Sequence, residues 1–181
     1  GDVSQDGTWT YAYNSADRIR RATSPTFDLR YYYDGDLRRR WSVSPASNPP
    51  LRMAFYYDDE GKLLADGQAF ARYVYLYDQP VARIDVFAMP CVDCSIGTVL
   101  RYYHADHEGT PIGMTSTNPS PTTPTWTWRA EYEPFGRVWS QSANSVVQYL
   151  RFPGQFQDYG TFLHYNDHRF YAPMIGRYLA P

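Results

Sequence analysis

The chain has 181 residues, a formal net charge of −2 and 18% aromatic residues. Such a high aromatic content argues against a disordered chain, and the near-neutral charge gives no electrostatic reason to expect nucleic acid as a partner. No apolar run approaches the length of a transmembrane helix, so we expect no membrane span. The sequence begins at Gly1 without an initiator Met or a visible signal segment, which indicates a fragment, a processed chain or a cloned portion of a protein.

A Tyr-rich motif recurs along the first half of the chain. In each copy two aromatic residues lie two positions apart and precede Asn14, Asp34, Asp58 or Asp78, so the spacing is 20, 24 and 20 residues. Side chains alternate between the faces of a strand, so this spacing places both rings on one face. The Asn or Asp ends the strand, because its side chain bonds the backbone two residues on. We therefore predict a β-hairpin for each repeat, with neighbours paired, because a lone hairpin is only marginally stable.

The residues after each Asp predict the hairpin loops. Gly61 supplies the positive φ that a longer hairpin loop needs, and the segment 133–136 is built alike. Asp34 and Gly35 predict a tighter hairpin of the Asp-Gly type. These signals, without any sustained helical periodicity, predict an all-β fold of consecutive antiparallel hairpins in one twisted sheet.

The composition also predicts how the side chains pack. We interpret the aromatic residues as core and cross-strand packing rather than a ligand-binding box, because Tyr and Phe dominate core energetics. Lys62 is the only lysine among 17 basic residues, and Arg packs well on aromatic faces. Two Pro-rich segments interrupt the pattern. Residues 44–50 are expected to form a loop, and residues 115–125 a mobile hairpin tip protruding from the sheet.

Five ordered motifs follow one another between residues 100 and 181. Their residues are Tyr103, His104, Asp106, His107, Gly109 and Pro111; Tyr132, Phe135, Gly136 and Arg137; Arg151, Pro153, Gly154 and Gln155; His164, Tyr165, Asn166, Arg169 and Tyr171; and Gly176, Arg177 and Tyr178. These motifs resemble the associated core region of Rhs (rearrangement hotspot) proteins. The upstream Tyr-Asp motifs resemble the Tyr-Asp (YD) repeats of the same family.

The resemblance implies both a fold and a role. The fold is a spiralling, curved sheet of hairpins that encloses a hollow shell, with YD-repeat hairpins over residues 1–99 and the Rhs-associated core over residues 100–181 in one continuous β array. Such shells enclose a variable C-terminal toxin in bacterial secreted systems, including insecticidal toxin complexes, and animal teneurins use a related shell in adhesion. The expected partners are therefore the rest of a parent shell and its toxin cargo. An extracellular or cell-surface location follows from the family alone.

One departure from the family affects catalysis. The family continues into an Asp-Pro-x-Gly element of a self-cleaving protease, whereas this sequence stops at residues 179–181. We therefore assign no catalytic residue and no cofactor, and expect a structural, non-enzymatic segment. One alternative is a module that joins copies of itself through two open sheet edges, and another is a remnant of the autoprotease.

Two cysteines suggest a disulfide. Cys91 and Cys94 would pair if the chain is secreted, and would pin the connection between residues 84 and 100. A zinc site formed with His104 and His107 is the alternative, but the spacing differs from ordinary zinc sites, so we expect no metal.

The polar residues near the C-terminus allow two interpretations. His164, Asp167 and His168, with Asp158 nearby, could form a hydrolytic cluster, but the simpler interpretation is that the histidines cap or pack strand ends. The candidate nucleophiles are expected in a turn-like stretch without a nucleophile elbow: Ser140, Ser142 and Ser145. Three arginines are expected to stack on aromatics or pair with Asp158 or Asp167, or to plug the end of the shell: Arg151, Arg169 and Arg177.

Overall fold

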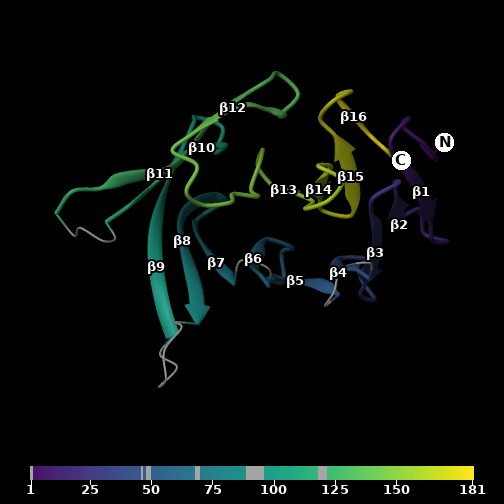
Figure 1. Cartoon of the computed structure of the whole chain (residues 1–181), viewed down its shortest axis with the longest axis horizontal. Helices are drawn as coiled ribbons and strands as arrows, with labels where there is room; N and C mark the ends of the chain where they lie inside the picture. The colour runs from purple at the N-terminus through teal and green to yellow at the C-terminus, as the bar shows by residue number, and fades with distance from the viewer. Residues whose placement is uncertain (1, 46, 48–49, 68–69, 89–95, 118–121) are drawn as a thin grey trace.

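The structure is a computed structural model that describes residues 2–45, 47, 50–67, 70–88, 96–117 and 122–181. Throughout these residues the chain forms antiparallel strands and contains no helix (Figure 1). A 12-stranded sheet and a 4-stranded sheet each follow the order of the sequence. The prediction of an all-β fold made of consecutive antiparallel hairpins is confirmed, but the strands form two sheets rather than the one sheet expected, because the last four strands pair only among themselves in the described part of the chain. With no helix in the described part, no segment there meets the criterion for a helical membrane span.

Each strand of the larger sheet pairs with the strand before and after it. Its strands are β1 (Thr10–Tyr13), β2 (Ile19–Thr23), β3 (Asp28–Tyr33), β4 (Arg39–Ser44), β5 (Leu51–Tyr57), β6 (Leu63–Asp66), β7 (Ala71–Leu76), β8 (Gln79–Ala88), β9 (Ile96–Ala105), β10 (Pro111–Ser116), β11 (Thr125–Tyr132) and β12 (Val138–Ser142). The smaller sheet contains β13 (Gln155–Gln157), β14 (His164–Asn166), β15 (Arg169–Ala172) and β16 (Arg177–Tyr178). The boundary proposed from the sequence between residues 99 and 100 falls inside β9, and the division at that point stays a prediction.

Five hairpin loops share one geometry. In the β5–β6 loop the Asp58 amide donates to the Lys62 carbonyl at 3.0 Å, and the Gly61 amide donates back to the Asp58 carbonyl at 3.1 Å. The Asp58 carboxylate also accepts the Lys62 amide at 2.7 Å. The same backbone bonds close the loops that begin at Asn14, Asp34, Asp106 and Glu133. In the first three repeats the Asn or Asp therefore closes its own loop, as expected.

Two details of the predicted hairpins are wrong. The loop after Asp34 is of the common longer type, with Leu37 rather than Gly35 at positive φ (62°). The reason is that the Asp34 carboxylate accepts the Asp36 and Arg38 amides and so holds the loop open over five positions. In the fourth repeat Tyr77 lies in the turn itself, at φ 54° and 88% exposed, instead of on the covered face of the strand.

The structure also shows where the two Pro-rich segments and the candidate serine nucleophiles lie. The connection expected at 44–50 lies between β4, which includes Ser44, and β5, with residues 46, 48 and 49 outside the described residues. The connection expected at 115–125 is shorter than predicted, because residues 115 and 116 belong to β10 and residue 125 belongs to β11. The mobility expected of the second connection is untested, and residues 118–121 lie outside the described residues. The prediction of a turn-like stretch around the serines is wrong for two of them, because Ser140 and Ser142 pair with β11 as part of β12.

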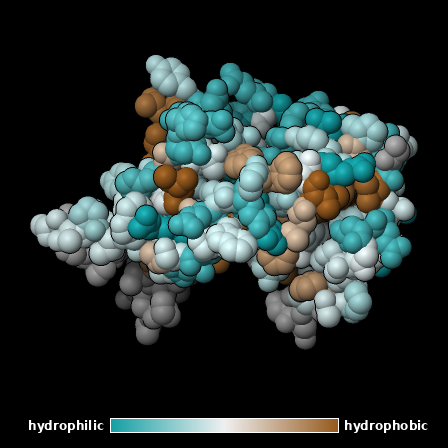
Figure 2. All heavy atoms as spheres, turned by 90° about the horizontal axis from the view of Figure 1, so that it is seen from above, coloured by the Kyte–Doolittle hydropathy of each residue, from teal (hydrophilic) through white to brown (hydrophobic). Residues whose placement is uncertain are grey.

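The larger sheet curves around the smaller one, which lies against its concave face (Figure 1). Two clusters of buried apolar side chains fill the space between the sheets. One joins the covered face of β5–β11 to Tyr149, Leu150 and Phe156, and the other joins β1–β3 to the smaller sheet. The alternation in β3 shows the cause, because Leu29 and Tyr31 are buried while Tyr32 is exposed. On the surface seen from above, hydrophobic side chains form separate groups among hydrophilic ones (Figure 2).

Candidate functional site at the seam between the two sheets

A buried ion pair joins the two sheets. Arg39 is the first residue of β4 and Asp158 follows β13, and the Arg39 Nη1 atom lies 2.6 Å from Asp158 Oδ1. Both side chains are almost fully buried, at 0% and 3% exposure. The other carboxylate oxygen accepts the Tyr31 hydroxyl at 2.7 Å and the Thr161 hydroxyl at 2.9 Å. The carboxylate is therefore saturated with donors, which is what a buried charge requires.

Aromatic rings enclose the guanidinium group of Arg39. Its Cζ atom lies 4.0 Å from the centroid of Phe55 and 4.4 Å from that of Tyr165. Three further rings lie within 6 Å: Phe170, Phe156 and Tyr31. Within the described part of the chain, the Nε and Nη2 atoms have no hydrogen-bond partner. The negative faces of the rings therefore supply the stabilisation that those N–H groups do not receive from oxygen atoms.

Burial and charge together set the ionisation of this group of residues. Burial, followed by the Asp158 charge, raises the pKa of the Tyr31 hydroxyl well above its ordinary value, so Tyr31 stays a neutral donor. Burial alone would lower the pKa of Arg39, but the nearby carboxylate raises it above its ordinary value. The result is a charged guanidinium and a neutral phenol fixed on one carboxylate.

This pairing differs from the one expected for Asp158. Arg151, Arg169 and Arg177 were the expected partners, but the partner is Arg39, from the repeat region. Arg169 stacks on Tyr178 with 4.0 Å between Cζ and the ring centroid, while Arg177 is exposed. Of the three, none forms an ion pair among the described residues.

Arg151 is a second buried guanidinium, bound by neutral oxygens. It donates to Gln157 Oε1 at 2.8 Å and to the carbonyls of Gln148 and Leu150, both at 2.8 Å. Burial lowers its pKa. Burial, followed by the charge of Arg151, also lowers the pKa of His164 to about 3. His164 is therefore neutral near pH 7, and its Nδ1 atom bonds Gln155 Oε1 at 2.7 Å.

The hydrolytic cluster considered from the sequence is divided between separate interactions. Asp158 binds Arg39, His164 binds Gln155, and His168 Nδ1 lies 2.9 Å from Asp167 Oδ2. Within the described residues, no group of three or more His, Cys, Asp or Glu side chains is arranged to hold a metal ion.

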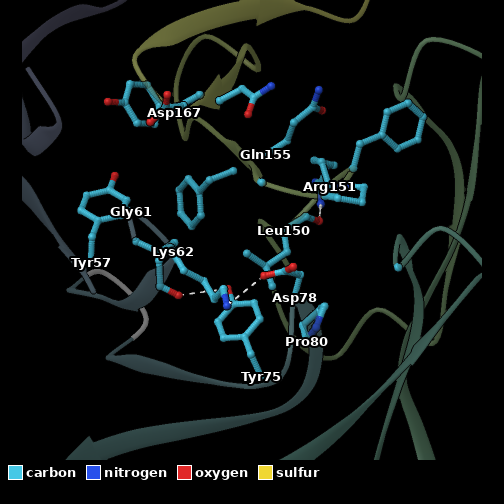
Figure 3. A pocket seen from close by; sticks show the side chains of 18 of the residues that line it. Tyr57, Gly61, Lys62, Tyr75, Asp78, Pro80, Leu150, Arg151, Gln155 and Asp167 are labelled. Atoms are coloured by element: carbon cyan, nitrogen blue, oxygen red, sulfur yellow. Dashed lines mark hydrogen bonds and ion pairs between the residues drawn. The ribbon is translucent and has the colours of Figure 1, made fainter. Parts of the chain in front are cut away.

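A cavity of about 490 Å³ opens along the same seam (Figure 3). It lies between the hairpin loops of the larger sheet and the segment 150–156 with the β14–β15 turn. Its lining includes several apolar and aromatic residues: Tyr57, Leu63, Tyr75, Pro80, Pro111, Leu150 and Phe156. At its margin Lys62 Nζ donates to the Tyr77 carbonyl at 2.8 Å and pairs with Asp78 at 3.0 Å.

Two basic residues link successive hairpin loops, and this role was not predicted from the sequence. Arg38 donates to the carbonyls of Asp58 and Asp59, each at 3.1 Å, so the β3–β4 loop is tied to the next loop. Lys62 ties the β5–β6 loop to the β7–β8 loop in the same way. Arg38 and Lys62 each stand four positions after the Asp of their repeat, and this shared offset was the available signal.

Most of the remaining motif residues take part in hydrogen bonds or packing, in part between distant segments of the chain. His104 Nε2 lies 2.9 Å from Thr115 Oγ1, whereas His107 is 89% exposed beside Glu108. Tyr103 is buried and donates to Gln148, and Tyr132 donates to the Pro111 carbonyl. Asn166 donates to the Tyr178 hydroxyl at 2.6 Å. Others make contacts at turns: Phe135 beside Gly176, Gly136 beside Phe152, Gly154 beside Asn166, and Arg137 on Glu133. Tyr171 packs against Tyr178 across β15 and β16.

The cysteine prediction is untested. Cys91 and Cys94 both lie outside the described residues, so the disulfide and the connection that it would pin stay predictions.

The comparison with protein families shows the family to which this chain belongs. A family model described as Teneurin YD-shell matches residues 1–181. The chain belongs to the teneurin YD-shell family. This YD-shell chain is 37% identical to the Escherichia coli (strain K12) uncharacterized protein YibJ over 82 residues, which are 45% of this chain and 33% of YibJ. It is 29% identical over 202 aligned residues to double-stranded DNA deaminase toxin A of Burkholderia cenocepacia (strain H111), covering 95% of this chain and 13% of that protein.

Solved structures support the same fold. The YD-shell chain matches the crystal structure of TcdB2-TccC3-Cdc42 with a TM-score of 0.70 and 20% identity, and that of TcdB2-TccC3 with a TM-score of 0.63 and 16% identity. These matches cover 98% and 96% of this chain but 9% of each solved chain. The chain thus spans a small part of the proteins that it matches. Its fold and family make it a structural segment of a YD shell.

Proposed function

We propose that this YD-shell segment forms part of a wall that encloses a C-terminal toxin in a bacterial secreted system. The role is mechanical rather than enzymatic, and the protein acts outside the cell or at its surface. Its partners are the rest of the parent shell and the toxin cargo. The observation that carries the proposal is the curved sheet closed onto a second sheet by the buried Arg39–Asp158 pair. A wall of this kind must keep its curvature while a large polypeptide lies against it.

The relatives support this role by their names and folds. One relative is named as a double-stranded DNA deaminase toxin, and this chain aligns with a small part of its length. A structural segment carried within a much longer toxin is consistent with that proportion. The side chains at the seam also suit a structural role, because their polar groups bind one another within the chain.

The test is protection of the cargo from a protease. A longer protein that contains this chain and a C-terminal toxin is treated with a broad-specificity protease, and survival of the toxin part is followed by mass spectrometry. We expect the cargo to survive in the intact protein and to be digested in Asp158→Ala, because the loss of one partner leaves Arg39 buried without its counter-charge.

A matched variant at the surface serves as the control. Arg21 pairs with Asp28 at 2.8 Å, but its side chain is 50% exposed. Arg21→Gln should therefore keep the cargo protected. Digestion of the cargo in the intact protein at the rate of the free toxin would contradict the proposal.

A further inference from the structure

Both edges of the larger sheet carry features that hinder the addition of a further strand. At the β1 edge the Tyr11 amide donates to the Ser4 carbonyl at 2.9 Å, and Gln5 forms a bridge to Thr10. The expectation of two open edges is therefore wrong for β1. At the β12 edge a β-bulge at Trp139 interrupts the regular pairing with β11, and bulges are among the features that protect an edge. The surface better suited to binding lies on the concave face of β8 and β9.

A recess of about 480 Å³ opens on this concave face. Arg83 of β8 lies opposite Tyr73 of β7, which belongs to the buried core, and Arg101 of β9 lies opposite Arg83. Both guanidinium groups are therefore on the face that the smaller sheet partly covers. The segment 145–149 and Tyr159 form the other wall of the recess. β8 and β9 extend well beyond the smaller sheet, so that sheet does not cover the whole of their concave face (Figure 1).

Two arginines share one carboxylate in the recess. Arg83 Nη2 lies 2.6 Å from Asp85 Oδ1, and Arg101 Nη1 pairs with Asp85 Oδ2. Arg83 Nη1 also donates to the Val147 carbonyl at 2.6 Å, which ties the two walls together. In the described part of the chain, Arg101 Nε has no hydrogen-bond partner. The arrangement differs from the seam between the two sheets, where one carboxylate serves one arginine.

Arg101 has less counter-charge around it than Arg83. Burial would lower the pKa of Arg83, but groups around it, Asp85 and Asp66 among them, raise it above its ordinary value. Burial lowers the pKa of Arg101, because the charge of Asp85 does not offset it and Arg83 adds repulsion. Arginine nevertheless stays charged in proteins. The recess therefore keeps a positive charge that the chain neutralises only in part, and a further carboxylate would stabilise it.

Exposed apolar side chains surround this charged group. Among the lining residues, Phe87 is 44% exposed, Val147 is 60% exposed and Tyr159 is 44% exposed. Binding surfaces between polypeptides commonly combine an arginine with aromatic side chains in one pocket. A small inorganic anion would leave the apolar side chains in water, whereas a peptide would cover them. The recess therefore suits a carboxylate whose neighbours along the chain are apolar.

We propose that this recess binds an acidic side chain of the polypeptide that the shell encloses. The carboxylate lies on Arg101, and apolar residues beside it in the bound chain pack on Phe87, Val147 and Tyr159. Naming the enclosed polypeptide as the source of the carboxylate rests on the proposed function. The position supports that source, because the concave face of a curved wall is turned toward what the wall encloses (Figure 1).

Peptide titration of the 181-residue chain tests the chemistry of the recess. The probes are two blocked tripeptides, acetyl-Leu-Glu-Leu-amide and acetyl-Leu-Gln-Leu-amide, and binding is followed by the backbone amide NMR resonances of β8 and β9. We expect the Glu peptide to bind saturably and the Gln peptide to bind at least about tenfold more weakly, because it lacks the charged acceptor. Equal binding of the two peptides, or no binding of either, would overturn the proposal.

A pair of matched variants locates the binding. Arg101→Gln should weaken binding of the Glu peptide by at least about tenfold, while Asp85 keeps its ion pair with Arg83 and so preserves the fold. Arg72→Gln removes the same charge from the opposite face of the sheet, since Arg72 is exposed between the buried residues Ala71 and Tyr73 of β7. This control should bind as the wild type does. Unchanged binding by Arg101→Gln, or an equal loss in Arg72→Gln, would contradict the assignment.

Cross-linking in the longer protein identifies the source of the carboxylate. A benzophenone-bearing phenylalanine analogue replaces Val147, whose exposed side chain lies at the rim of the recess. After irradiation, we expect mass spectrometry to find cross-links to a cargo segment that contains Asp or Glu, and fewer of them when Arg101→Gln is added. Cross-links to shell segments alone would overturn the proposal even if the cargo survived the protease. Digestion of the cargo would instead contradict the protective role without altering peptide binding by Arg101, so the two proposals fail separately.

Discussion

The hairpins of the larger sheet and the seam between the two sheets are stabilised over different distances along the chain. Five of the hairpin loops are each closed by hydrogen bonds within five consecutive positions, as at Asp58 and Lys62. The seam depends on Arg39 and Asp158, which are 119 residues apart, and on Tyr31, which is 127 residues from Asp158. The hairpins can therefore form as separate local units, whereas the curvature of the whole depends on a few contacts that form only when the chain closes.

The largest predicted effect comes from breaking the seam. Asp158→Ala removes the counter-charge of Arg39 and the acceptor of Tyr31, so we expect the free energy of unfolding to fall by about 3–5 kcal/mol. Urea unfolding followed by circular dichroism measures the change. The double variant Arg39→Met with Asp158→Leu should recover much of the loss, because an apolar pair leaves no buried charge.

The surface pair Arg21–Asp28 gives the contrast for this experiment. Arg21→Gln removes an ion pair whose Arg side chain is 50% exposed, and no measurable change in stability is expected. If Asp158→Ala were as mild as Arg21→Gln, the seam would not depend on its buried charge.

A second prediction tests the loop geometry at two glycines. Gly109 has a φ of +90°, and a Cβ atom there would meet only ordinary van der Waals contacts. Gly109→Ala should therefore cost about 1–2 kcal/mol through backbone strain alone. Gly35 has open space around it and does not adopt a positive φ, so Gly35→Ala should cost nothing. Thermal unfolding of both variants compares them. If Gly35→Ala lowered the stability as much as Gly109→Ala, the result would support the two-residue Asp-Gly turn predicted from the sequence.

The loop after Asp34 also shows which parts of the fold could be predicted from the sequence and which could not. The repeats predicted the hairpins and their order, because the pattern is local. A two-residue loop at Asp34–Gly35 would pair Arg39 with Arg30, which is exposed, and turn Arg38 toward the core. The actual longer loop pairs Arg39 with Tyr33 and places it in the core. A change in loop length thus decides which of three consecutive arginines is buried.

The partner of Arg39 could not be predicted from local patterns at all. Asp158 lies in a segment whose motifs indicate a family but not the strand of the larger sheet that it faces. The open cavity and the buried His164–Gln155 contact have the same origin, because both depend on how the smaller sheet lies against the larger one. The contacts between successive loops, by contrast, could have been predicted, because Arg38 and Lys62 both stand four positions after the Asp of their repeat.

The smallest predicted effect concerns a single loop. In Asp34→Ala the amides of Asp36 and Arg38 lose their acceptor, at a cost of about 1 kcal/mol. Asp34→Asn should cost less, because Asn14 accepts the corresponding amides of Ala16 and Arg18 in the first repeat. Both variants lose the contact with Arg40, so their difference isolates the loop bond. Urea unfolding should show this difference with an unchanged slope against urea concentration. If the two variants were equally unstable, the aspartate of the repeat would act through its charge on Arg40 rather than by closing its own loop.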